Sequence, residues 1–288
     1  MNAPSGSQKA AEAKAPAAAL PTAPPWWRTL RADGPAHVRF ALGASFIALL
    51  LLLWWVLTRG AATEAIISPS KLPSPGKVFG SFGAVMERDL IGAIIATLSR
   101  VFFGVALAAL IGIGLGVIAA SFRAVGAAMM PLVIFLRSVP MGALLPLTLL
   151  WFSIGEEQKR MFIFLAVVPF VFSDTVQAIS SVPERYVETA QTLGASRLQI
   201  VVKVLLRLAL PDIVTSLRFQ VGLALGYVTL AEAINTETGI GALINTSDRL
   251  GYQEHKYLIL FIIALLAFGI DACIRVFQRQ LFYYRKDL

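Results

Sequence analysis

The chain has few of the residues that build disulfide frameworks, metal centres and cofactor sites. Cys273 is the only cysteine, which excludes a disulfide within the chain and any CxxC metal motif. The two histidines, His37 and His255, are far apart in the sequence, so no metal-binding cluster is expected. No phosphate-binding loop of the GxxxxGKS or GxxxxGKT type occurs. The sequence therefore predicts no metal site, no cofactor and no nucleotide site within this chain.

Charged residues are also scarce, at 15% against 57% hydrophobic residues, which favours a membrane protein over a soluble domain. Two uncharged runs, Phe40 to Thr58 and Val101 to Phe122, are each long enough to cross a hydrocarbon core of about 30 Å as a helix. Four further apolar segments follow, at roughly 131–152, 161–180, 213–235 and 257–277. The sequence predicts an all-α polytopic membrane protein with six transmembrane helices.

The distribution of positive charge predicts how these helices are oriented. With six spans, both termini lie on one side of the membrane. That side holds 15 of the 25 Lys and Arg residues, and the opposite side holds 8. The positive-inside rule therefore places both termini in the cytoplasm. The net charge of +8 follows from this topology and from contact with anionic membrane lipid. No nucleic acid partner is expected, because no basic stripe is interleaved with aromatic residues.

The N-terminal segment differs in composition from the rest of the chain. Residues 1–36 are rich in alanine and proline and lack a sustained apolar period. Such a composition cannot bury a core, so we expect a disordered cytoplasmic N-terminus. Residues 37–288 then form the transmembrane domain.

Small residues recur at four-residue intervals in the second apolar run. They are Ala108, Gly112 and Gly116, with Gly104 upstream. Small side chains at this period let another helix approach closely. The pattern predicts tight helix packing in the membrane and no ligand site.

The stretch Ser181 to Pro211 is polar, although it lies between apolar segments of membrane length. A charged stretch of this size must lie in water. It contains two predicted capping boxes, Ser181-x-x-Glu184 and Ser196-x-x-Gln199. Gly194 lies between the two predicted helices, where a left-handed backbone ends a helix at little cost. A structured helical hairpin in water indicates a docking surface for another protein.

The hairpin also carries a resemblance to a known family. Glu188-Thr189-Ala190-x-x-x-Gly194, followed by Leu210-Pro211, resembles the EAA motif of ABC importer permeases. Other motifs, in order over about residues 70–275, resemble the permease subgroup for nitrate, taurine and aliphatic sulfonates. They are Leu72-Pro73-Ser74-Pro75, Thr97-Leu98-x-Arg100-Val101, Leu136-Arg137-x-Val139-Pro140, Pro146-Leu147, Trp151-Phe152-x-Ile154-Gly155-Glu156, Leu217-Arg218, Ala231-Glu232 and Gly239-Ile240-Gly241-x-Leu243-Ile244. Two residues depart from the usual pattern. Thr189 replaces the second residue of the motif, and Arg207 stands where many relatives have the first of two prolines.

The resemblance implies a type I ABC importer permease (MetI-like) fold with a cytoplasmic coupling helix. It implies a homodimer in the bacterial cytoplasmic (inner) membrane and a periplasmic or other extracytoplasmic solute-binding protein. It also implies a cytoplasmic ABC ATPase subunit that holds ATP and Mg and performs the hydrolysis, so that this chain is a non-catalytic permease. The helix from Glu184 to Leu193 would insert into a cleft of that ATPase. The implied coupling residues are Glu184, Glu188, Thr189, Ala190, Leu193, Gly194, Ala195 and Ser196.

Polar residues inside apolar segments are costly in lipid and are therefore candidates for the translocation path. Arg137, with Ser138 and Pro140, predicts an irregular positive helix that attracts an anion, or else an arginine paired with Asp174 or Glu232. On the fifth span, Gln220, Tyr227 and Glu232 predict a polar face that lines the path.

Other charged residues are expected to be structural. Asp271 and Arg275 are predicted to form an i,i+4 ion pair. Arg100 is predicted to extend its charge toward the outer membrane edge. The segment from Glu156 to Arg160 is predicted to be a solvated loop.

Two classes of function remain open at this point. The favoured one is a permease subunit that alternates access under the control of a separate ATPase and carries a small anionic solute. The alternative is a self-contained secondary carrier or channel with Glu232 and Asp174 as coupling groups. A membrane-embedded enzyme is disfavoured, because no cluster of His, Cys or carboxylate residues has catalytic spacing.

Overall fold

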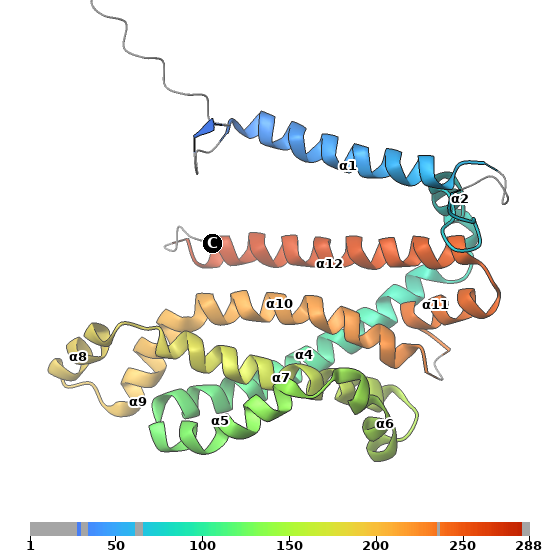
Figure 1. Ribbon diagram of the computed structural model, residues 1–288. Helices are drawn as coiled ribbons and strands as arrows, with labels where there is room; N and C mark the ends of the chain where they lie inside the picture. Colours follow the sequence, from blue (N-terminus) through green and yellow to red (C-terminus); the bar gives the residue numbers. More distant parts are fainter. Residues whose placement is uncertain (1–27, 30–33, 61–65, 235–236, 284–288) are drawn as a thin grey trace, which may run out of the picture. The chain divides into compact units, whose positions relative to one another are not determined.

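The structure is a computed structural model that describes residues 28–29, 34–60, 66–234 and 237–283. Every regular element in these ranges is helical, as Figure 1 shows. The helices are α1 (Ala36–Thr58), α2 (Pro75–Gly80), α3 (Phe82–Met86), α4 (Leu90–Ser121), α5 (Arg123–Ser138), α6 (Met141–Phe152), α7 (Glu156–Ser180), α8 (Glu184–Thr192), α9 (Arg197–Gln199), the π-helix η2 (Ile200–Leu205), α10 (Leu206–Glu232), α11 (Ile240–Arg249) and α12 (Gln253–Leu281).

The chain divides into two units, Met1–Val56 and Leu57–Leu288. The first contains nearly all of α1, an apolar helix long enough to cross a membrane. The disorder predicted for residues 1–36 falls almost entirely outside the described residues. The second unit contains all the other helices, and both candidate sites belong to it.

Fewer apolar spans are present than the six expected. In the described residues, α1, α4, α7 and α12 are long and apolar enough to cross a membrane. Helices α5 and α6 add a fifth span if they are counted as one broken unit. The expected span at 213–235 lies in α10, which is long enough but carries charged residues along its length, among them Arg207, Asp212 and Arg218. The all-helical membrane fold is confirmed, and the count of six is not.

The expected straight span at 131–152 is broken. Helices α5 and α6 meet at an angle of 102°. The break falls at Val139 and Pro140, whose backbones are extended. A proline disfavours helical geometry at the residue before it, which explains why the first helix ends at Ser138.

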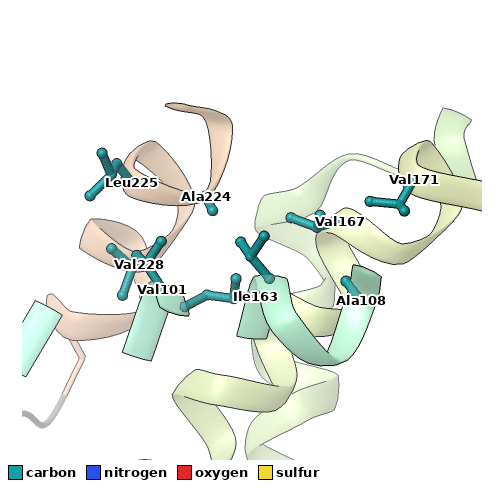
Figure 2. Close-up of a cluster of buried hydrophobic side chains, with 9 residues drawn as sticks. Val101, Ala108, Ile163, Val167, Val171, Ala224, Leu225 and Val228 are labelled. Atoms are coloured by element: carbon teal, nitrogen blue, oxygen red, sulfur yellow. The ribbon is translucent and has the colours of Figure 1, made fainter. Parts of the chain in front are cut away.

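The core of the second unit lies between α4, α7 and α10. Valine, isoleucine, leucine and alanine side chains from these three helices form one buried cluster, shown in Figure 2. Helices α4 and α7 share the most extensive contact in the chain. The expected row of small residues makes this contact possible. A methyl group added at Gly112 would lie 2.9 Å from a methyl of Val171, and one at Gly116 would lie 2.8 Å from Cβ of Thr175. The predicted packing role of the small residues is confirmed.

The two ends of the second unit differ in what they present. The hairpin of α8 and α9 connects the end of α7 to the beginning of α10 (Figure 1). At the opposite end of these two helices lie the beginning of α7, the end of α10, and helices α6 and α11 (Figure 1). The chain thus has a hairpin end and an opposite end, and each contains one candidate site.

Candidate functional site

The first half of the hairpin is helix α8, which ends in a Schellman motif. The amide of Ala195 donates to the carbonyl of Ala190 at 3.0 Å, and the amide of Gly194 donates to that of Gln191 at 2.9 Å. Gly194 has φ +77°, the left-handed geometry predicted for it. Ala190 and Gly194 of the motif therefore have a local structural role, because together they end α8 sharply and turn the chain back.

The beginning of α8 differs from the prediction, whereas the beginning of the second helix agrees with it. Ser181 belongs to the end of α7, and its hydroxyl donates to the carbonyl of Ala178, so the first capping box is wrong. Pro183 occupies the N-cap position of α8 instead. At α9 the predicted box is confirmed. The amide of Gln199 donates to the Ser196 hydroxyl, and the Gln199 side-chain oxygen accepts from the amide of Ser196.

The hairpin exposes apolar side chains on an otherwise polar surface. Leu193 is 82% exposed and Leu198 is 73% exposed. Glu184, Glu188 and Thr189 are exposed along α8, which buries none of its residues. A groove of about 290 Å³ lies beneath, between the inner face of the hairpin and the end of α4 at Ser121. Exposed apolar side chains rimmed by polar residues are typical of a surface that binds another protein.

The break between α5 and α6 presents Arg137 and Ser138 on the outside of the single chain. The Arg137 guanidinium donates to the Ser173 hydroxyl at 2.5 Å and lies over the ring of Phe170. It forms no ion pair with Asp174 or Glu232 among the described residues, so the expected structural pairing is wrong. Pro140 begins α6.

The polar residues predicted for the fifth span lie at two different levels. Gln220 and Ser216 of α10 both donate to the Asp174 carboxylate of α7, near the hairpin end. Tyr227 is partly buried and packs against a cluster that includes Leu145. Glu232 lies 12 residues beyond Gln220, which is about 18 Å along a helix. Asp174 and Glu232 therefore have different partners and do not form one group.

A second polar cluster at the opposite end surrounds Arg100, which is only 1% exposed. Its Nε and Nη2 donate to the two carboxylate oxygens of Glu156 at 2.8 and 2.6 Å. Its Nη1 donates to Glu232 at 2.6 Å and to the carbonyl of Thr238 at 2.9 Å. Nη2 also donates to the Thr238 hydroxyl at 3.0 Å. The guanidinium therefore uses all five of its N–H groups.

This cluster changes three expectations. Arg100 does not extend to the membrane edge, because burial and two carboxylates hold it inside the protein. The segment from Glu156 to Arg160 is the first turn of α7, and the Lys159 ammonium lies 3.5 Å from Glu156. Glu232 is fully buried and bonded, so its carboxylate does not line an accessible path in this structure. By contrast, the Asp271–Arg275 ion pair is confirmed, and Asp271 also pairs with Arg218 at 2.9 Å.

Comparison with known proteins identifies the family. Residues 112–282, from the middle of α4 to just past the end of α12, match the family of binding-protein-dependent transport system inner membrane components. The chain belongs to this family. The permease is therefore a multi-pass inner-membrane subunit of an ABC importer, a system in which the ATPase is a separate subunit.

Full-length relatives give the same result for this permease. The taurine transport system permease protein TauC of Escherichia coli is 32% identical over 88% of this chain and 93% of its own length. The riboflavin transport system permease protein RibX of Chloroflexus aurantiacus is 31% identical over 84% of this chain and 89% of its own. The aliphatic sulfonates permease SsuC of E. coli, described as putative in its name, is 31% identical over 50% of this chain and 55% of its own.

Solved structures agree on the fold of the permease. An inward-facing MetNI methionine ABC transporter matches with a TM-score of 0.59 at 24% identity, over 66% of this chain and 95% of the solved one. An amino acid ABC transporter matches with the same TM-score at 16% identity, over 70% and 96%. The predicted importer permease fold is confirmed, and family membership rules out the self-contained carrier.

Proposed function

We propose that this permease moves a small anionic solute by alternating access, driven by a separate ABC ATPase that docks on the hairpin. The supporting observation is the hairpin itself. Helix α8 ends in a Schellman turn, and Glu188 and the C-cap residue Leu193 are exposed beside that turn. A rigid element is required to transmit the closure of an ATPase to membrane helices.

The partners follow from the same reasoning. ATP and Mg would be held by the ATPase, and a solute-binding protein would deliver the solute on the opposite side of the membrane. The hairpin and both termini would lie in the cytoplasm, as the distribution of Lys and Arg predicts. Because Arg137 and Ser138 face outward from the single chain, a second copy would be needed to enclose a path.

Reconstitution into vesicles tests this function directly. Vesicles that contain the permease, its ATPase and its binding protein are expected to accumulate a labelled sulfonate or nitrate when ATP is supplied. Vesicles with the permease alone are expected to accumulate none. Uphill accumulation by the permease alone would contradict the proposal.

The anionic class of solute is supported by Arg137 and by the names of two relatives, which refer to taurine and aliphatic sulfonates. Arg137 is an exposed cation at a helix break, and no described carboxylate neutralises it. A charged hydrogen bond to a solute contributes about 1.5–3 kcal/mol, which corresponds to at least a tenfold change in binding.

Arg137→Gln is therefore expected to lower anion uptake about tenfold, whereas Arg137→Lys keeps the charge and retains most of the uptake. Initial rates of uptake in the reconstituted complex measure this. Arg160→Gln is the matched control, since Arg160 also lies over a phenylalanine ring, that of Phe103, but pairs with Glu157. Equal losses in the Arg137 and Arg160 variants would contradict an anion site at the helix break.

A further inference from the structure

The cluster around Arg100 is not used by the transport function proposed above and needs an explanation of its own. A buried ion pair is costly to remove from water, and an apolar pair of the same size would pack equally well. Arg100 and Lys159 balance the charges of Glu156 and Glu232, so the cluster is neutral as a whole. The contacts of its neighbours indicate what it holds in place.

Helix α11 has no side-chain cap of its own, because its N-cap residue is Gly239. Its first amides are satisfied by other helices instead. The amide of Ile240 donates to the hydroxyl of Thr97 on α4 at 2.9 Å, and the amide of Gly241 donates to Glu232 on α10 at 2.8 Å. The Thr97 hydroxyl in turn donates to the Glu232 carboxylate at 2.8 Å. The beginning of α11 is thus held by α4 and α10.

The two glycines at this point are required by the close approach of the cluster. A methyl group at Gly239, whose φ is +116°, would lie 2.5 Å from Nη1 of Arg100. One at Gly241 would lie 2.5 Å from the carbonyl oxygen of Thr229. The backbone of α11 therefore lies directly against the ion pair, and its position depends on that of Arg100 and Glu232.

The two carboxylates that bind Arg100 are in different surroundings. The side chain of Glu232 is 0% exposed, whereas that of Glu156 is 48% exposed. Glu156 begins α7 just after Ser153, a non-glycine residue with φ +58°. The α6–α7 turn is braced by a bond from Gln158 to Thr148. Glu156 therefore connects the turn after the broken helix pair to the same guanidinium that supports α11.

We propose that Arg100 is a positioning residue that seats the beginning of α11 against α4 and α10 through Glu232 and Thr97. Glu156 is the second carboxylate partner of Arg100 and connects the beginning of α7 to the guanidinium. Its ion pair is expected to be weaker than that of Glu232, because its side chain is half exposed. The hairpin joins the other ends of α7 and α10. Because Glu156 lies on α7 and Glu232 on α10, a movement of one helix relative to the other at the hairpin would change the contacts of Arg100. This inference goes beyond transport and holds whichever solute is carried.

The test measures the seating of α11 in the purified full-length chain in detergent. Cys273 is the only cysteine, so Cys273→Ala leaves a chain without thiols, and Ala242→Cys then places one thiol on α11. Ala242 is only 5% exposed, so slow reaction with a bulky maleimide is expected. Leu250→Cys at the exposed end of α11 serves as the reference for fast reaction.

Thr97→Val removes one of the two bonds that cap α11, the one from the amide of Ile240, but leaves Arg100 with both carboxylates. It is expected to raise the labelling rate at position 242 at least about threefold, and Thr97→Ser is expected to restore the slow rate. Arg100→Met is expected to raise the rate about tenfold or more, because it leaves the buried Glu232 carboxylate without its cation. Glu232→Gln is expected to raise it similarly, because it removes the charged acceptor shared by Arg100, Thr97 and the amide of Gly241. Glu156→Gln, at the half-exposed partner, is expected to raise it about threefold.

Glu157→Gln is the matched control, since Glu157 is the next residue and forms only an exposed pair with Arg160. Its labelling rate is expected to remain that of the parent chain. An unchanged rate in Thr97→Val would overturn the proposal, even if the Arg100 variant fails to fold. An equal rise in Glu157→Gln would also overturn it. Neither result depends on an ATPase or a solute, so the proposed transport function would stand.

Discussion

Replacing Glu188 with lysine, or Gly194 with tryptophan, is expected to release the ATPase from a permease that remains inserted in the membrane. Glu188 is an exposed carboxylate on α8, and reversal of its charge would oppose any charge-assisted bond to the partner. Apart from the neighbours of Gly194 in the sequence, no atom of the described residues lies within 4 Å of the position of an added Cβ, so the bulk of tryptophan would obstruct the partner. Gly194 has a left-handed backbone, and tryptophan in that geometry would add about 1–2 kcal/mol of strain at the end of α8.

Co-purification of the ATPase with the tagged permease measures this effect. A loss of at least about tenfold is expected for either variant, since truncation of a central contact often costs 2 kcal/mol or more. Glu87→Lys is the control, because Glu87 is exposed and lies outside the hairpin. If both hairpin variants retain the ATPase and its transport-stimulated hydrolysis, the hairpin is not the docking surface.

Replacing Gly112 with leucine is expected to disrupt the packing of α4 on α7. An added Cβ alone would lie 2.9 Å from Val171 and 3.2 Å from the backbone nitrogen of Phe172. Backbone cannot move aside as a flexible side chain can, so the cost should be about 3 kcal/mol, at the upper end of the usual cost of overpacking. The yield of monodisperse protein in detergent and the midpoint of its thermal unfolding measure this loss.

Gly114→Leu is the matched control, two residues along the same helix. Outside the backbone of its own helix, no atom of the described part of the chain lies within 4 Å of the position of its added Cβ, and Gly114 is exposed. Leucine favours helix over glycine by close to 1 kcal/mol, so this variant is expected to be neutral or slightly stabilising. Equal stability of the two variants would show that the row of small residues does not determine the packing.

Features that depend on neighbours in the sequence were the ones that could be predicted. The glycine that ends α8, the capping box at Ser196 and the Asp271–Arg275 pair all involve residues within five positions of one another. The row from Gly104 to Gly116 follows from helical periodicity alone. Each is a local pattern, and each is present in the structure.

The cluster around Arg100 could not be found in this way, because its carboxylates are 56 and 132 residues away. Burial of charge in an apolar segment was nevertheless a usable signal. Arg100 and Glu232 are each costly alone in lipid, and pairing them would have removed both costs. The sequence-based prediction placed Arg100 at the membrane edge and Glu232 on the translocation path, and it therefore did not include the ion pair between them.

Prolines were an ambiguous guide to broken helices. Pro131, Pro146, Pro169 and Pro211 all lie inside helices, whereas Pro140 lies at the sharp break between α5 and α6. A helix can lose one backbone bond at a proline and continue when neighbouring helices support it. Tertiary packing therefore decides which proline interrupts a span, and the sequence does not reveal it.

The π-helix η2, between the hairpin and α10, has a consequence for how this chain tolerates a change in length. A π-helical turn bonds residues five apart, and so accommodates one residue more than an ordinary helix would. Shortening Ile200–Leu205 by one residue would let the segment become regular helix while the flanking faces keep their orientation. The same deletion within α10 would rotate every later side chain by about 100° and expose Gln220 and Glu232.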